Sequence, residues 1–189
     1  MARISPVRTQ TKDGAPLVIR AAQETDASNT LSLYGTVIDE GRYTMLQRDE
    51  LTRSAEQEAD AIRSDAEHPA RLRLVAAAGD ALVGMVRVSC GDLARTSHFG
   101  DIDSLRVHPE YRRQGIGSAL LDALIAWAES QPRVEKLGLY VFSTSEAAIG
   151  LYRSRGFIEE GRGTRDIKFG ADDYADTIMM GKLLTHHAV

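Results

Sequence analysis

A glycine-containing segment, RRQGIGS at residues 112–118, constrains the fold of this chain more than any other part of its sequence. An apolar, extended segment precedes it and a helical pattern follows it, so it predicts a strand-to-helix turn. The first backbone N–H groups of a helix have no intrahelical acceptor and lie at the positive end of the helix dipole. Gly115 and Gly117 leave the backbone there open to close approach. The segment therefore predicts a turn that can bind a phosphate group.

The elements on either side of this turn are well marked. The strand before it, Asp101–Val107, ends at His108-Pro109, because proline cannot continue a hydrogen-bonded ladder. In the helix after it, apolar residues recur at helical spacing until Pro132 ends the pattern. These apolar residues are Leu120, Leu121, Leu124, Ile125 and Ala128. We therefore expect this helix to pack one face on a sheet.

The remaining segments predict about seven strands and about four helices in all. Gly79-Asp80 favours a tight hairpin turn between two apolar runs. A helix follows Asp26, and a capping box at Ser143–Glu146 begins a short helix that Gly156 ends. The other predicted elements are an exposed helix over Arg48–Ser64 and strands over Leu17–Arg20, Arg71–Ala78, Ala81–Ser89, Lys136–Phe142, Phe157–Glu160 and Asp176–Leu184.

Length and composition are those of one globular domain. Of the 189 residues, 43% are apolar and 26% are charged, close to average globular usage. We expect a flexible leader over residues 1–16, a single domain over 17–185 and a tail over 186–189. A net charge of -4 with mixed signs argues against nucleic acid as a partner. One cysteine, no apolar run of membrane-spanning length and no secretion signal favour a cytoplasmic location and no membrane partner.

Three kinds of phosphate-binding turn can be compared with residues 112–118. A nucleotide P-loop needs a Gly-Lys-Ser/Thr ending, which is absent, and a dinucleotide turn needs a third glycine where Leu120 stands. Glycines in such a turn can also serve steric purposes alone. The pattern formed by Arg112, Gly115 and Gly117 resembles the coenzyme turn of the GNAT superfamily of acyl-CoA-dependent N-acetyltransferases.

Two further segments carry the same resemblance. Residues 105–111 (LRVHPEY) and 151–157 (LYRSRGF) resemble the flanking segments of the superfamily, in the right order. The resemblance implies an α/β (α+β) fold with a mixed, mostly antiparallel sheet, in which the strands Asp101–Val107 and Lys136–Phe142 splay apart at a bulge. The ending, residues 161–180, is similar to members that acetylate small amines and amino acids.

The resemblance also implies where acetyl-CoA binds as a cosubstrate. The backbone of the segment Leu105, Arg106 and Val107 would hold the pantetheine arm, and a free amide near Leu105 would polarise the thioester carbonyl. The diphosphate would bind to Arg112, Arg113, Gln114, Gly115, Ile116, Gly117 and Ser118. The short helix would contribute Ser145, Ala148 and Tyr152 to the cofactor site. Superfamily members usually have asparagine where this chain has Ser145, which can replace it or cap the helix.

The catalytic groups follow from the chemistry of acetyl transfer. The departing thiolate needs a proton, and the phenol of Tyr152 stays protonated at neutral pH, as the equivalent tyrosine does in the superfamily. A base must take a proton from the amine. Asp101 and Asp103 are candidates because they share strand parity with Leu105 and Val107, although a bulge would disturb that parity. Glu40, at the end of the first helix, is a third candidate. If water takes the proton from the amine, none of the three carboxylates is needed as a base.

The sequence therefore predicts an enzyme that transfers an acetyl group from acetyl-CoA to the primary amine of a small molecule, such as an amino acid, by direct attack in a ternary complex. A protein N-terminal or lysine acetyltransferase and a non-catalytic CoA-binding module are the alternatives. No metal is expected, because His98, His108, His186 and His187 match no compact ligand set. A homodimer is possible in this family. The charged residues of 50–67 are expected to form a solvated helix face without a function.

Overall fold

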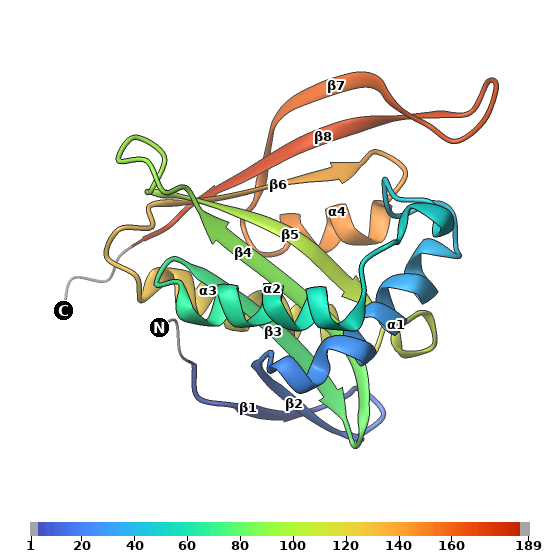
Figure 1. Cartoon of the computed structure of the whole chain (residues 1–189). Helices are drawn as coiled ribbons and strands as arrows, with labels where there is room; N and C mark the ends of the chain where they lie inside the picture. Colours follow the sequence, from blue (N-terminus) through green and yellow to red (C-terminus); the bar gives the residue numbers. More distant parts are fainter. Residues whose placement is uncertain (1–3, 186–189) are drawn as a thin grey trace.

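The computed structural model describes residues 4–185 and contains one eight-stranded sheet with the strand order β1-β2-β3-β4-β5-β6-β8-β7 (Figure 1). Only β5 and β6 pair in parallel; all other neighbours are antiparallel. The strands are β1 (Val7–Gln10), β2 (Pro16–Ala21), β3 (Arg71–Ala78), β4 (Ala81–Cys90), β5 (Phe99–Val107), β6 (Lys136–Phe142), β7 (Ile158–Lys168) and β8 (Tyr174–Leu183). The α-helices are α1 (Ala27–Ile38), α2 (Ala55–Glu67), α3 (Ile116–Glu129) and α4 (Glu146–Arg153).

The expected mixed, mostly antiparallel sheet with four α-helices is confirmed, with one strand more than expected. The extra strand is β1, which lies in the segment interpreted as a flexible leader and pairs with β2. All its residues are exposed, so its sequence has no alternation of apolar and polar residues to mark it. The expected tail, 186–189, lies outside the described residues. No helix within residues 4–185 has both the length and the apolar character that crossing a bilayer requires.

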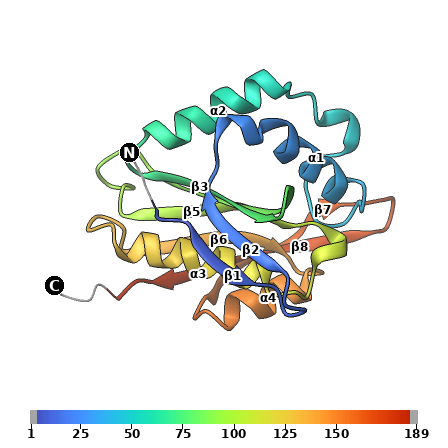
Figure 2. The same cartoon turned by 90° about the horizontal axis from the view of Figure 1, so that it is seen from below.

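The helices cover the two faces of the sheet in pairs. Figure 2 shows α1 and α2 on one face and α3 and α4 on the other. The larger core lies on the α3 side and contains the predicted apolar face of α3, together with Leu137 and Leu139 of β6. A smaller core lies under α1 and α2 and includes Val37, Ile62 and Met85. The prediction that α3 packs on the sheet is therefore confirmed.

The strands β5 and β6 splay apart, as predicted. They pair only from Phe99 with Lys136 to Asp101 with Gly138, although both strands continue for several residues. On its other edge, β5 contains a bulge between Asp103 and Arg106, where the register with β4 shifts and Ser104 takes a positive φ of 63°. A bulge bends the strand and turns the following side chains to the other face. The splay opens one edge of β5 beyond Asp101.

The helix predicted over Arg48–Ser64 is shorter and later in the structure, and its charged face is partly buried. The helix α2 begins after Ser54, whose hydroxyl accepts the amide of Gln57. Glu58 and Asp65 are buried, at 1% and 3% exposure. Asp65 binds the arginines of two strands, as Arg73 Nη2 lies 2.7 Å and Arg87 Nε 2.9 Å from its Oδ2. The expectation of a wholly solvated face was therefore wrong, because these partners lie on strands outside the helical segment.

Candidate active site

The turn at residues 112–118 presents a run of unpaired backbone amides. Arg113 and Gly115 have positive φ angles of 62° and 87°, so the chain curls just before α3. Among the described residues, the first amide in this region that donates to a helix carbonyl is that of Ala119, to Gly115 at 3.0 Å. The amides of 113–118 have no acceptor in this part of the chain, and Gly115 provides no side-chain cap. Successive free amides at a helix N-terminus form an anion-binding concavity.

The two glycines of the turn have different roles. At Gly115 a Cβ would meet nothing within 4 Å, but the left-handed backbone disfavours any other residue. At Gly117 a Cβ would lie 3.3 Å from Leu151 Cδ2 and 3.7 Å from Val107 Cγ2. Gly117 therefore allows α3 to pack closely against α4 and β5. Of the two, Gly115 has the open side from which a ligand can approach.

The two arginines of the turn also differ. Arg112 forms a bidentate ion pair with Glu40, and its Nε donates to the carbonyl of Val107 at 3.2 Å. Its guanidinium lies 4.9 Å from the ring centroid of Tyr43. Arg113 is exposed, so its charge is the more available for a diphosphate. The ion pair places Glu40 beside the turn, and its carboxylate is already paired there.

The bulge in β5 reverses the strand parity that the sequence interpretation assumed. Leu105 and Val107 pack against the core on the α3 side, whereas Asp103 reaches Arg87 on the α2 side. The prediction that Asp101 and Asp103 share a face with Leu105 and Val107 was therefore wrong, because the bulge inserts a residue between them. Within residues 4–185, Ser104 and Leu105 have no ladder partner on β4 or β6. The ladder is therefore interrupted at the bulge, on the part of β5 that lies beyond its pairing with β6.

Tyr152 lies in α4, below the splayed strands. Its side chain is 7% exposed and its ring contacts Phe157 edge-on, with the centroids 5.9 Å apart. The hydroxyl has no partner among the described residues and is not among the fully buried unpaired atoms, so the exposed part of the side chain includes it. Burial raises the pKa of Tyr152 to about 12, although the charge of Arg106 opposes this shift. Tyr152 is therefore a protonated donor throughout the neutral range.

Asp101 and Asp103 have different surroundings despite their nearness. Asp103 Oδ2 lies 2.6 Å from Arg87 Nη1. Asp101 has no ion pair among the described residues, and burial, followed by the charge of Asp103, raises its pKa, while Arg87 partly opposes the shift. A carboxylate with a raised pKa is a better proton acceptor than one paired with arginine. Asp101 is thus the candidate whose carboxylate is not held in an ion pair within residues 4–185.

The start of α4 differs from the predicted capping box. Ser143 pairs instead with β8, where its hydroxyl accepts the amide of Asp176 at 3.1 Å. The helix begins at Glu146, and the side chain of Ser145 makes no cap hydrogen bond. The capping role considered for Ser145 is therefore absent. Ala148 is partly buried against the core on the same helix.

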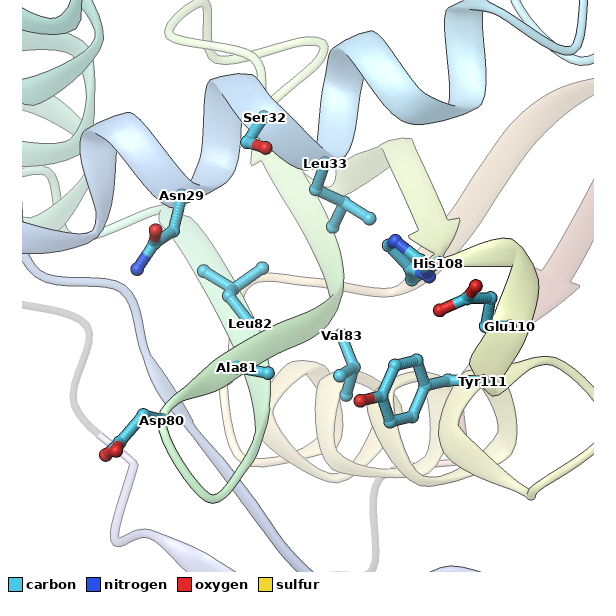
Figure 3. A pocket seen from close by; sticks show the side chains of 10 residues that line it. All are labelled: Asn29, Ser32, Leu33, Asp80, Ala81, Leu82, Val83, His108, Glu110 and Tyr111. Carbon is cyan, nitrogen blue, oxygen red and sulfur yellow. The ribbon is translucent and has the colours of Figure 1, made fainter.

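Two hollows open on the α1 side of the sheet. One, of about 280 Å³, is lined by Asp101 together with Phe99, Tyr140 and Met179. The other, of about 300 Å³, lies between α1, the start of β4 and the segment after β5 (Figure 3). His108, Glu110 and Tyr111 line one side of this second hollow. None of the predicted site residues lines it, so we assign it no step of the transfer.

One residue of the site was considered in the sequence only for its backbone. The guanidinium of Arg106 lies 3.8 Å from the ring centroid of Tyr34 in α1, and Tyr34 Oη lies 2.8 Å from Ser104 Oγ. The available signal was a charged residue between the apolar Leu105 and Val107. Arg106 follows the bulge, on the part of β5 that lies beyond its pairing with β6.

Comparisons with known proteins agree with this geometry. The sequence model of the acetyltransferase (GNAT) family matches residues 40–157, more than half of the chain. The L-amino acid N-acetyltransferase AaaT of Escherichia coli is 28% identical over 118 residues, 62% of this chain and 72% of that protein. The ribosomal protein bS18-alanine N-acetyltransferase of Escherichia coli is 46% identical over 56 residues, 30% of this chain and 37% of that protein.

Solved structures show the same fold. A GNAT-family acetyltransferase from Streptococcus pneumoniae has a TM-score of 0.84 at 28% identity, covering 89% of this chain and 99% of that one. The yncA structure from Salmonella typhimurium, with its cofactor acetyl-CoA, has a TM-score of 0.79 at 20% identity, covering 92% of this chain and 96% of that one. The family match and the shared fold place this chain in the GNAT family of acetyl-CoA-dependent N-acetyltransferases.

Proposed function

We propose that this acetyltransferase acts on the primary amine of a small molecule, with an amino acid as the favoured acceptor. The observation that carries the proposal is a contact between the connection after α1 and the β7–β8 hairpin. Arg42, in the connection after α1, pairs with Asp173 of the β7–β8 hairpin at 2.8 Å, and its guanidinium lies 5.0 Å from the ring centroid of Phe169. An acceptor bound between these two segments would be limited in length by this contact, whereas a protein substrate needs an open groove.

The relatives give further support. The Escherichia coli relative named for L-amino acids matches a longer part of this chain than the protein alanine N-acetyltransferase does. The hollow beside Asp101, at about 280 Å³, is also slightly below the usual range of about 300–1,000 Å³ for small-molecule pockets. Both observations favour a small acceptor over a polypeptide.

The residues present fit acetyl-CoA and divide the work of the transfer. The free amides of 113–118 bind the diphosphate, and the open edge of β5 holds the pantetheine arm. Acetyl-CoA supplies an acetyl thioester, whose carbonyl oxygen a free bulge amide near Leu105 polarises. A bond forms between the amine nitrogen and the carbonyl carbon, and the carbon–sulfur bond breaks. Tyr152 gives its proton to the sulfur, and Asp101, directly or through water, takes the proton that leaves the nitrogen.

A release assay for the CoA thiol tests this function directly. The purified protein is incubated with acetyl-CoA and, in turn, with the common L-amino acids, linear polyamines, and peptides with a free amino terminus or a lysine. We expect turnover with amino acids well above that with peptides. Turnover with peptides alone would instead support a protein acetyltransferase, and no turnover with any amine would support a binding module without catalysis.

The pH dependence of kcat tests the choice of Asp101 as the base. Its raised pKa means that kcat falls as the pH falls through that pKa, since the protonated acid cannot accept a proton. Asp101→Asn should lower kcat by about 10-fold, less than the usual 10²–10⁴-fold because water can also accept the proton, and should remove this decline. Asp103→Asn should keep the decline but move it to lower pH, because the charge of Asp103 raises the pKa of Asp101. If kcat depended on pH in the same way in the wild type, Asp101→Asn and Asp103→Asn, Asp101 would be excluded as the base.

A further inference from the structure

One arginine that is largely withdrawn from solvent has no acidic partner. Within residues 4–185, the other arginines that are buried or partly buried form ion pairs with Asp or Glu; these are Arg20, Arg71, Arg73, Arg87, Arg112 and Arg155. The exception is Arg106 of β5, which is partly buried and has no ion pair in this part of the chain. The positive charge of Arg106 is therefore not paired with a carboxylate, in contrast to the charges of the other six arginines.

The donors of Arg106 are buried as well as unpaired. Its Nε and Nη1 are inaccessible to solvent and have no hydrogen-bond acceptor among the described residues. A buried donor on a charged group is costly when it has no partner, and a stacked aromatic ring recovers only part of that cost. The ring of Tyr34 supplies this stacking, and Ser104 fixes the ring through its hydroxyl. The guanidinium is thus held in place by Tyr34, while its Nε and Nη1 donate no hydrogen bond to residues 4–185.

Arg106 follows the bulge on β5, at the open edge of the splayed strands. The bulge turns its side chain toward α1, whereas Leu105 and Val107 pack toward the α3 core. Arg106 nevertheless lies on the part of β5 that no longer pairs with β6, where the splayed strands open. Its charge also opposes the rise in the pKa of Tyr152 that burial causes. The diphosphate turn is formed by other residues, at the start of α3. An anion bound by Arg106 would therefore belong to the acceptor.

We propose that Arg106 binds a carboxylate of the acceptor and so selects amines that carry a carboxylate near the reacting nitrogen. This proposal rests on the proposed function and deepens it. A guanidinium matches the planar geometry of a carboxylate and binds it through charge-assisted hydrogen bonds. The α-carboxylate of an amino acid lies close to its amine, so one side chain can hold the acceptor while its nitrogen faces the thioester. Arg106 is thereby a specificity-determining residue.

Steady-state kinetics with paired acceptors test this role. Each L-amino acid that the wild type acetylates is compared with its carboxamide, which keeps the amine and side chain but lacks the negative charge. We expect kcat/KM for the acid, calculated on the concentration of the neutral amine, to exceed that for the carboxamide by at least about 10-fold. In Arg106→Gln this ratio should fall to about 1, through a raised KM for the acid, with the KM for acetyl-CoA unchanged. Because the ratio is compared between proteins, the different basicities of the two amines cancel.

Two further variants complete the comparison. Arg106→Lys keeps the charge but loses the planar fork, so its ratio should be intermediate. Arg133→Gln removes an exposed arginine outside the site and should leave the ratio at the wild-type value. If Arg106→Gln does not fold, the acid-to-carboxamide ratios of kcat/KM in the wild type and in Arg106→Lys still test the proposal.

Several outcomes would overturn the proposal. An equal loss for acid and carboxamide in Arg106→Gln would assign Arg106 to acetyl-CoA or to the chemistry. Wild-type turnover of amines without a carboxylate, but not of amino acids, would overturn the role of Arg106 and the choice of an amino acid as acceptor, and would leave intact the transfer to a small-molecule amine. Turnover of peptides alone would overturn both.

Discussion

Tyr152→Phe is expected to lower kcat by about 10²-fold with little change in the affinity for CoA, because the variant keeps the ring and loses only the proton donor. The ring is packed against Phe157 within the α3-side core, so phenylalanine can occupy the same space. Its hydroxyl makes no hydrogen bond within the described residues, so removing it leaves no partner unsatisfied. The stability of the fold should therefore change little, and the loss should lie in the chemical step.

The measurement is kcat by thiol release together with the Kd for CoA by calorimetry. Tyr174→Phe serves as the control, since Tyr174 lies at the start of β8 and stacks with Arg165. It should retain wild-type kcat. Because the pKa of Tyr152 is about 12, its own ionisation should not reduce the wild-type rate between pH 7 and 10. An unchanged kcat in Tyr152→Phe would remove this residue from the mechanism.

Gly115→Val is expected to weaken CoA binding by about 100-fold, which corresponds to losing two charge-assisted hydrogen bonds of roughly 1.5 kcal/mol each. The φ of 87° at this position is strongly unfavourable for a β-branched residue, so the turn must change its conformation and its amides must diverge. The side chain would also occupy the open space in front of these amides. Both effects act on the diphosphate site, and neither acts on Tyr152.

Gly79→Val is the matched control for this variant. Gly79 also has a positive φ, of 60°, and open space at the Cβ position, but it lies in the β3–β4 hairpin. Both variants should lose stability through backbone strain, which thermal unfolding measures, but only Gly115→Val should lose affinity for CoA in calorimetry. Equal affinities in the two variants would show that the turn does not bind the diphosphate.

Local sequence signals predicted the elements that form the site. The hairpin around Gly79, the helix after the glycine turn and the strand before it all depend on turn residues or apolar periodicity within a short segment. These signals act between neighbouring residues, and the structure contains each of these elements. The splayed strands followed from family resemblance, and their short parallel pairing confirms them.

Long-range pairing was not predictable in the same way. The arginine partners of Asp65 lie on β3 and β4, and Ser143 pairs with β8 instead of capping α4. The bulge at Ser104 changes which side chains share a face, so one residue reversed the expected parity of Leu105 and Val107. In each case the outcome depends on interactions with another strand, and the sequence pattern of a single segment does not predict such interactions.

In the proposed mechanism, the amides of 113–118 bind the diphosphate of CoA and thereby place its sulfur beside Tyr152. A crystal structure of the protein with CoA tests this most directly. We expect the diphosphate oxygens to lie within hydrogen-bonding distance of these amides and the pantetheine arm to lie between β5 and β6. The sulfur should lie within reach of the Tyr152 hydroxyl. A diphosphate bound elsewhere, or a sulfur remote from Tyr152, would contradict it.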